Sequence, residues 1–514
     1  MCRSLVVFGD GDMSEAFLQA IQQTVCDPQV WGVVIISAFY GVFLGAMPGL
    51  TATMGVALFV PMTFWLGPVP AVAAIVTMVA CAIFAGDIPT TLMRIPGTPA
   101  SAAYADDAYA MANRGEAGRA LGMALWFSVT GGLFGAVVLM LAGHQLAKIA
   151  AWFSVAEYFW LYLMGLSCAV IVGQASVPRA LLGLLLGLLF STVGLSAVHA
   201  QARFTFGQTE LYQGINFIPA MIGLFGVSEV FRNVTQLVLD TRIVKPVPVG
   251  RDGILGPATR SFARRPLAWL RSSVIGAVTG ILPGAGADIA AWVSSAVSKR
   301  YSRTPEVYGA GSEECIADAC TANSASLAGA WIPALVFGIP GDSITAIVIG
   351  VLYMKNLKPG PEIFEQQGAF VYSIYLVFLL ANLVLLPVGL LAIRTGGQVM
   401  RVPRPILLPI ILLFCIVGAY AVNSSLFDVG LMLGFGLLGL ICERWKISLG
   451  AMVLGIILGG PLEERFVQTL TAGQGSPIAF VNRPVSGTLA LVCLLLWGSV
   501  AWRAWNRHSR TGSN

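Results

Sequence analysis

The sequence GVFLGAMPGL at residues 41–50 returns as GAVTGILPGA at residues 276–285. A second pair follows in the same order, with IPTTLMRIPG at residues 88–97 and IPALVFGIPG at residues 332–341. Matching residues lie 235 positions apart in the first pair and 244 positions apart in the second. One Gly-Pro coincidence means little in a chain with 58 Gly and 27 Pro, but two matches in register predict an internal repeat.

The segments around these breaks are too apolar for a soluble protein. Hydrophobic residues make up 57% of the 514 residues and charged residues only 11%, whereas a soluble domain carries about 25% charged residues. Lipid removes the need for a polar exterior. We therefore predict an all-α polytopic membrane protein of about 10–14 transmembrane helices with re-entrant or broken hairpins. Its two repeated halves are expected to be inverted.

Charge and hydropathy divide the chain into five segments. They are an N-terminal surface segment (1–29), a first transmembrane half (30–231), a basic linker (232–271), a second transmembrane half (272–480), and a last helix with a basic tail (481–514). Cytoplasmic loops of membrane proteins carry an excess of Lys and Arg. The linker and tail are therefore expected in the cytoplasm, and we attribute their charge to topology, not to nucleic-acid binding.

The Pro-Gly breaks predict a binding site. Proline ends or kinks a helix, and glycine lets another group approach closely. The main-chain groups freed at membrane depth must face protein, water or cargo, and paired breaks in two halves point to a transporter site. We assign substrate contact to the first breaks of the two halves, which comprise Pro48, Gly49, Leu50 and Thr51, and Pro283, Gly284, Ala285 and Gly286. The alternative is that the breaks only kink helices for packing.

The second breaks offer polar groups for a carboxylate. Thr98 and Ser343 place hydroxyls beside the free amides of Gly97 and Gly341, although the same hydroxyls could cap the next helix. Asn323 is a further candidate for substrate contact. The guanidinium of Arg94 would suit a substrate carboxylate, or would equally pair with Asp87.

Three acidic residues near the breaks are candidates for the coupling ion. Asp87, Asp288 and Asp342 lie in or beside apolar runs, where an ionisable group defaults to a functional hypothesis. They would bind Na+ or a proton, or alternatively serve as helix caps or interfacial carboxylates. Nine dispersed Cys and three dispersed His predict neither a metal site nor catalytic residues, and we expect no enzyme activity and no other cofactor.

The chain resembles the large membrane subunit of the tripartite tricarboxylate transporter family, the TctA-like proteins. The similar stretches are GVFLGAMPGLT (41–51), RIPGTPASAAYADDAYAMANRGEAGRALG (94–122), GILPGAGADIAAWVSSAVSKRYS (280–302) and NSASLAGAWIPALVFGIPGDSITAIVIG (323–350). The resemblance implies a multi-pass protein of the bacterial inner membrane. It also implies two partners, a small TctB-like membrane subunit and a periplasmic TctC-like substrate-binding protein, with import of small carboxylates driven by an ion gradient.

Some residues depart from the family pattern where ligand contact is expected. Phe84-Ala85-Gly86-Asp87 replaces a Gly-Gly-Ser-like element, Arg94 stands where Asn is common, and Asn323 is followed by Ser324 in place of a second Asn. These changes argue against a simple transfer of citrate specificity. An ion-gated channel or facilitator for organic anions is the alternative function.

Overall fold

The computed structural model describes residues 10–47, 50–172, 176–196, 201–237, 253–284, 286–399 and 404–511. Helices dominate these residues. Two short strands, β1 (Gly194–Leu195) and β2 (Ala202–Arg203), pair antiparallel and form the single sheet of the described ranges. The predicted all-α polytopic class is confirmed.

Seven helical stretches among the described residues are long and apolar enough to cross a membrane. They lie in α2 (Pro28–Ala46), α4 (Pro68–Ala85) with α5 (Asp87–Met93), α7 (Ala117–Ala150), α10 (Phe217–Met221) with the π-helix η3 (Ile222–Val227) and α11 (Ser228–Leu237), α15 (Glu313–Phe337), α18 (Gly368–Val399) and α20 (Leu426–Arg444). Shorter apolar runs lie in α3 (Ala52–Thr63), α8 (Val155–Val172), α9 (Val177–Ser191), α16 (Ser343–Met354), α19 (Arg404–Asn423) and α22 (Pro484–Thr511).

The remaining helices join or flank these elements. They are α1 (Asp10–Thr24), α6 (Ala105–Asn113), α12 (Gly256–Arg264), α13 (Pro266–Ile281), α14 (Gly286–Tyr301), α17 (Pro361–Gln366) and α21 (Leu449–Ala472), with the short helices η1 (Ser101–Ala103), η2 (Thr209–Gln213), η4 (Pro305–Val307) and η5 (Pro477–Phe480). Part of the predicted linker, residues 238–252, lies outside the described ranges.

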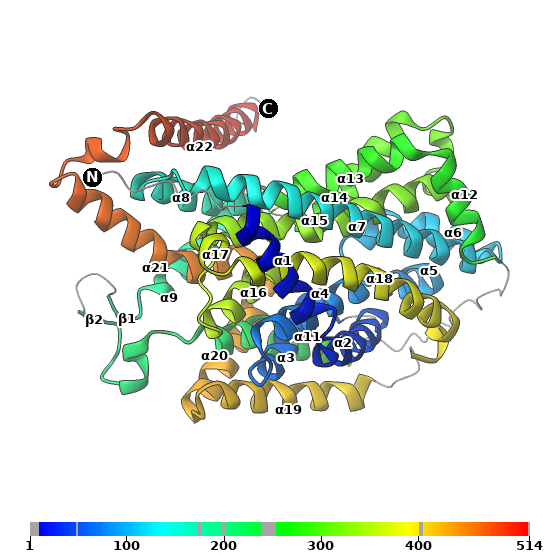
Figure 1. The fold of residues 1–514 in the computed structure, drawn as a ribbon, viewed down its shortest axis with the longest axis horizontal. Coiled ribbons are helices and arrows are strands. Elements are labelled where there is room, and N and C mark those ends of the chain that lie inside the picture. Colours follow the sequence, from blue (N-terminus) through cyan, green and yellow to red (C-terminus); the bar gives the residue numbers. More distant parts are fainter. Residues whose placement is uncertain are drawn as a thin grey trace.

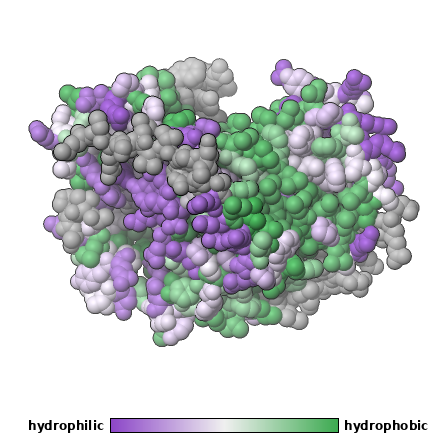
Figure 2. Space-filling view, in the orientation of Figure 1, coloured by the Kyte–Doolittle hydropathy of each residue, from purple (hydrophilic) through white to green (hydrophobic). Residues whose placement is uncertain are grey.

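The long helices share a direction that gives the molecule two ends. In Figure 1, α7 and α18 run across the view, with β1 and β2 at one end and α6 and α12 at the other. Figure 2 shows a broad apolar area across the middle of this face, with hydrophilic residues gathered beside it and at the edge. This distribution suits a lipid-facing belt between two polar ends.

Helices α4 and α15 form the buried centre. Every residue of α4 from Val69 to Ala85 is buried. In α15, every residue from Cys315 to Val336 is buried. Helix α4 packs mainly on α2 and α18, whereas α15 packs mainly on α7, α13 and α14. Helices α13 and α14 form a hairpin, so that the start of α13 lies beside the end of α14. There the Arg271 guanidinium lies 5.4 Å from the ring centre of Tyr301.

Glycines set the same close helix contact in both halves. A Cβ at Gly41 or Gly45 would collide with the carbonyl oxygen of Met78 or Ala82 on α4. A Cβ at Gly276 or Gly280 would likewise collide with the carbonyl oxygen of Ala322 or Ser326 on α15. The glycines of the first half lie 235 positions before those of the second half, and the contacted carbonyls of the first half lie 244 positions before those of the second. These are the two spacings of the sequence matches.

The two central helices also end alike. The N–H of Ile95 donates to the carbonyl of Pro89 and that of Arg94 to Thr90, which ends α5. At the end of α15, Ile339 donates to Pro333 and Gly338 to Ala334. Arg94 and Gly338 both adopt the left-handed conformation that closes such helix ends. These matched contacts support the predicted repeat, which together with its inverted arrangement stays a prediction.

We expect Gly276→Ala to lower the thermal stability of the purified protein in detergent. The added methyl group would push α13 away from α15, and such overpacking costs about 1–3 kcal/mol. Gly434→Ala is the control, because Gly434 lies on the exposed side of α20 with open space around its Cα. Equal melting temperatures of the two variants would contradict the proposed close contact.

Candidate functional site

A cavity of about 440 Å³ lies where the chain breaks of both halves meet. Its walls come from several separate segments. They include Thr51, Ala52, Thr53, Gly97, Thr98, Pro99, Gly286, Ala287, Asp288, Asn323, Asp342 and Ser343, together with Phe225, Glu229, Arg232 and Glu443. Segments more than 200 positions apart in the sequence thus share one cavity. The sequence predicted such a meeting point, and the contribution of each residue to binding stays a prediction.

Three helices begin at this cavity. The first residues of α3 (Ala52), α14 (Gly286) and α16 (Ser343) all line it. The first turn of a helix has unpaired N–H groups and a partial positive charge of roughly half an elementary charge. Three such ends together favour an anionic group in the cavity.

The first break of the first half contributes through Thr51. Its Oγ1 accepts a hydrogen bond from the N–H of Met54 at 3.2 Å, so the side chain caps α3. Leu50 is only 3% exposed and packs in the apolar core, away from the cavity wall. Pro48 and Gly49 lie outside the described residues.

The first break of the second half is tied to the second break of that half. Gly284 has φ +80°, and its N–H donates to the carbonyl of Gly341 at 2.8 Å. A Cβ on Gly284 would approach Ala169, and one on Gly341 would approach Ala330, so both glycines serve close packing. Neither glycine nor Pro283 lines the cavity, Gly286 does, and Ala285 lies outside the described residues.

The second break of the first half places Gly97 and Thr98 in the wall. The N–H of Gly97 donates to Oγ1 of Thr90 at 3.1 Å. Oγ1 of Thr98 accepts from the N–H of Ser101 at 3.1 Å, so this hydroxyl caps the turn that follows. The indole N–H of Trp292 on α14 donates to the carbonyl of Pro99 at 3.3 Å. Thus α14 of one half contacts the second break of the other.

The second break of the second half brings Asp342 and Ser343 to the cavity. Asp342 caps α16: its Oδ1 accepts from the N–H of Thr345 at 2.7 Å, and its own N–H donates to Thr345 Oγ1 at 3.0 Å. The capping alternative for Asp342 therefore describes its geometry, although the residue also lines the cavity. Asp288 lies in the first turn of α14, in the same wall.

Asn323 supplies an amide group from the buried helix α15. The residue is only 3% exposed, yet it lines the cavity. Its side-chain amide has no hydrogen-bond partner among the described residues, whereas its carbonyl accepts from Ser326. A carboxamide in this setting can donate to an anion or accept from a cation or hydroxyl.

Two predicted site residues lie away from the cavity. Arg94 pairs with Asp106, through Nε at 2.9 Å and a terminal nitrogen at 2.6 Å, and both side chains are 60% exposed. The Arg94–Asp87 pair, one of the two alternatives for Arg94, is therefore wrong, because the guanidinium pairs with Asp106 instead. Asp87 is buried, accepts from the Tyr104 hydroxyl and lies 3.8 Å from the Cys320 sulfur.

Three charged residues in the cavity were missed from the sequence. Glu229 and Arg232 come from α11, and Glu443 comes from the end of α20. Arg232 forms an ion pair with Glu229 and lies 3.8 Å from Glu443. All three lie at the ends of apolar runs, where charges normally mark the membrane boundary, and only the packing of α11 against α20 brings them to the cavity.

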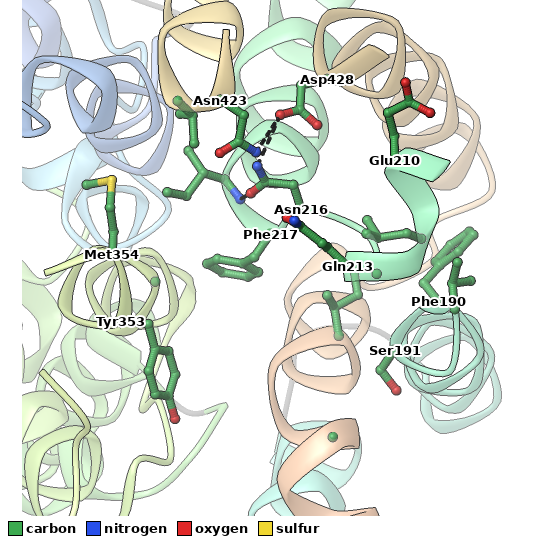
Figure 3. Close-up of a pocket in the computed structure, with 18 of the residues that line it drawn as sticks. Phe190, Ser191, Glu210, Gln213, Asn216, Phe217, Tyr353, Met354, Asn423 and Asp428 are labelled. Carbon is green, nitrogen blue, oxygen red and sulfur yellow. Dashed lines mark hydrogen bonds between the residues drawn. The ribbon is translucent and has the colours of Figure 1, made fainter. Parts of the chain in front are cut away.

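A second cavity, of about 890 Å³, lies at the opposite ends of α16 and α20 from the first cavity. Figure 3 shows Asn216, Phe217, Tyr353 and Met354 around it, with the side-chain amides of Asn216 and Asn423 donating to Asp428 at 3.1 and 2.9 Å. Helix α16 has Ser343 at the first cavity and Met354 at the second. Its middle residues, such as Ile347 and Val348, are buried between them.

We expect Arg94→Gly to preserve both thermal stability and the carboxylate uptake that the sequence predicts. Glycine removes left-handed strain of about 1–2 kcal/mol, which offsets an exposed ion pair of at most about 1 kcal/mol. Melting in detergent and uptake by vesicles would measure the two properties. A stable variant that has lost uptake would show that Arg94 does contact the substrate.

Comparison with known proteins identifies a family whose members this chain is similar to. Residues 32–454 match the sequence model of the tripartite tricarboxylate transporter TctA family, and this range contains every residue of the cavity wall. An uncharacterized 52.8 kDa protein in the TAR-I ttuC' 3' region of Agrobacterium vitis is 33% identical over 465 residues, which cover 90% of this chain and 91% of that protein.

A shorter relative matches part of the chain. This uncharacterized protein, in the TAR-II ttuC' 3' region of Agrobacterium vitis, is 31% identical over 224 residues, which cover 43% of this chain and 93% of that protein. No solved structure matches the chain.

Proposed function

The chain belongs to the tripartite tricarboxylate transporter TctA family, and we propose that it imports small carboxylates by secondary active transport across the bacterial inner membrane. It would act as the large permease subunit, with a small membrane subunit and a periplasmic substrate-binding protein as partners. The observation that carries the proposal is the convergence of three helix starts and an unpartnered buried amide on one cavity.

The polar groups of the cavity suit a carboxylate. N–H groups at the starts of α3, α14 and α16 that the caps at Thr51 and Asp342 leave unbonded can donate to carboxylate oxygens, as helix N-termini commonly do for anions. Arg232 adds a guanidinium to the lining of the same cavity. A volume of about 440 Å³ is enough for a di- or tricarboxylate of small size.

The acidic residues of the cavity argue for a co-transported cation. Glu229, Asp288, Asp342 and Glu443 face a single arginine, Arg232, among the described lining residues. A multiply charged carboxylate would be repelled by this surplus of negative charge in a partly desolvated space. A sodium ion or a proton entering with the substrate would offset the repulsion and couple the two movements. We propose Asp288 and Asp342 for this role.

The two cavities support alternating access. They lie at opposite ends of α16 and α20, and buried apolar residues of both helices separate them. Movement of the hairpin helices α13 and α14 against α11 and α20 would open the cavity of about 440 Å³ toward one end of the molecule or the other. The same arrangement would serve a channel only if both ends could open together.

Uptake into proteoliposomes would separate these functions. The chain is reconstituted with its two partner subunits, and a sodium or a proton gradient is imposed while the other is collapsed. We expect accumulation of a labelled carboxylate from a di- and tricarboxylate panel above its outside concentration, under one gradient. Equilibration to the outside concentration without further accumulation would contradict the proposal and indicate a channel or facilitator.

We expect Asp288→Asn to reduce gradient-driven accumulation by about tenfold or more. The amide keeps the shape of the side chain but removes the charge that would hold the cation, and an ionic contact is worth roughly 1.5–3 kcal/mol. Glu306→Gln is the control, since Glu306 is an exposed acid of η4 outside the cavity. Normal uptake with unchanged ion dependence in Asp288→Asn would exclude this residue from coupling.

A further inference from the structure

A third cavity, of about 590 Å³, lies at the end of the molecule that carries the basic linker. It is lined by α12, the start of α7 and the start of α15. Its wall includes four arginines and two glutamates, namely Arg119, Arg260, Arg264, Arg265, Glu313 and Glu314. The transport proposal assigns this cavity no role.

Two of the four arginines have no acidic partner among the residues that the structure describes. Arg119 forms ion pairs with Glu116 and Glu313, and Arg265 lies 3.4 Å from Glu314. These contacts use both glutamates of the wall. Arg260 and Arg264 have no ion pair within the part of the chain that the structure describes, and both are exposed. They lie four residues apart on α12, so their side chains project from the same face.

Aromatic contacts hold α12 against the membrane-spanning helices. The Phe262 ring packs edge-on against Trp126 of α7 and Trp269 of α13, with ring centres 6.4 and 5.3 Å apart. Ala258 is completely buried on the same side. A Cβ on Gly122 of α7 would collide with the carbonyl oxygen of Ile254, so the chain just before α12 also lies directly on α7. The arginines are thereby left on the outer side of an amphipathic helix.

The cavity lies at the level where lipid headgroups are expected. The apolar spans of α7 and α15 begin at Ala117 and Glu313, beside the cavity. Beyond Arg264, helix α13 exposes a stripe of large apolar side chains along one face, made of Leu267, Leu270, Val274 and Val278. Tryptophans such as Trp126 and Trp269 are common at this depth. The stripe begins at Leu267, two residues after Arg265 of the cavity wall.

We propose that this cavity binds an anionic phospholipid. Its phosphate would lie between Arg260 and Arg264, and an acyl chain would follow the apolar stripe of α13. Basic pockets between membrane helices on the positively charged side bind such headgroups. The apolar stripe favours a lipid over free phosphate, which could satisfy the arginines alone. The bound lipid would hold α12, and with it the linker between the two halves, against α7 and α15.

Thermal unfolding of the purified full-length chain in detergent tests this proposal. Phosphatidylglycerol, phosphatidylcholine with the same acyl chains, and sodium phosphate are titrated separately. We expect phosphatidylglycerol alone to raise the melting temperature. Each basic side chain near a lipid surface strengthens the binding of an anionic lipid. The double variant R260Q/R264Q should therefore need about tenfold more phosphatidylglycerol to reach half of the shift in melting temperature.

The matched control is R300Q/R303Q, which removes two exposed arginines, one in the last turn of α14 and one just beyond it. This control should respond like the wild type, and R260K/R264K should recover part of the response by restoring the charge. If R260Q/R264Q melts early without lipid, the single variants R260Q and R264Q are compared by the same criterion. An equal response of the Gln variants and wild type, or an equal shift with phosphate or phosphatidylcholine, would overturn the proposal.

Discussion

An interrupted helix inside a membrane exposes main-chain N–H and C=O groups that lipid cannot satisfy. In this protein the main-chain groups at the interruptions are accommodated in two ways. Some of their groups bond to one another, as Gly284 does to Gly341 and Gly97 does to Thr90. Others lie in the first turns of α3, α14 and α16 at a shared cavity, where Thr51 and Asp342 cap part of them. The rest of the structure holds these ends together, since α4 and α15 are buried around them and small residues allow the hairpins to approach.

The sequence allowed the breaks to be located because proline and glycine change backbone geometry locally. The carbonyls that meet Gly41 and Gly276 lie at the spacing of the sequence matches, and the helix ends at Arg94 and Gly338 use equivalent hydrogen bonds. Backbone chemistry of this kind depends on residues close in sequence. Which break residues face the cavity depends on packing instead, and so Gly284 and Gly341 proved to be contacts between segments while Gly286 and Ser343 line the wall.

Long side chains were harder to place from the sequence. Arg94 was expected at a carboxylate, but its backbone turn carries it to Asp106. Arg232 follows an apolar run and looks like a boundary residue, yet the packing of α11 on α20 places it in the cavity that Asp288 also lines. Such side chains extend several ångströms from the backbone, and their position follows the orientation of whole helices. No pattern within one segment could have joined Glu229 to Glu443.

The distribution of charge over these elements bears on how transport would proceed. Arg232 is paired with Glu229 on its own helix and lies near Glu443 of α20, so these three groups would move together. Asp288 and Asp342 belong to α14 and to the cap of α16, which are joined through the Gly284–Gly341 hydrogen bond between their breaks. Relative movement of the two groups would change the distance between the arginine and the two aspartates. The free energy of a carboxylate and a cation in the cavity would then depend on conformation, and a transporter needs that dependence to couple the movements of its substrate and ion.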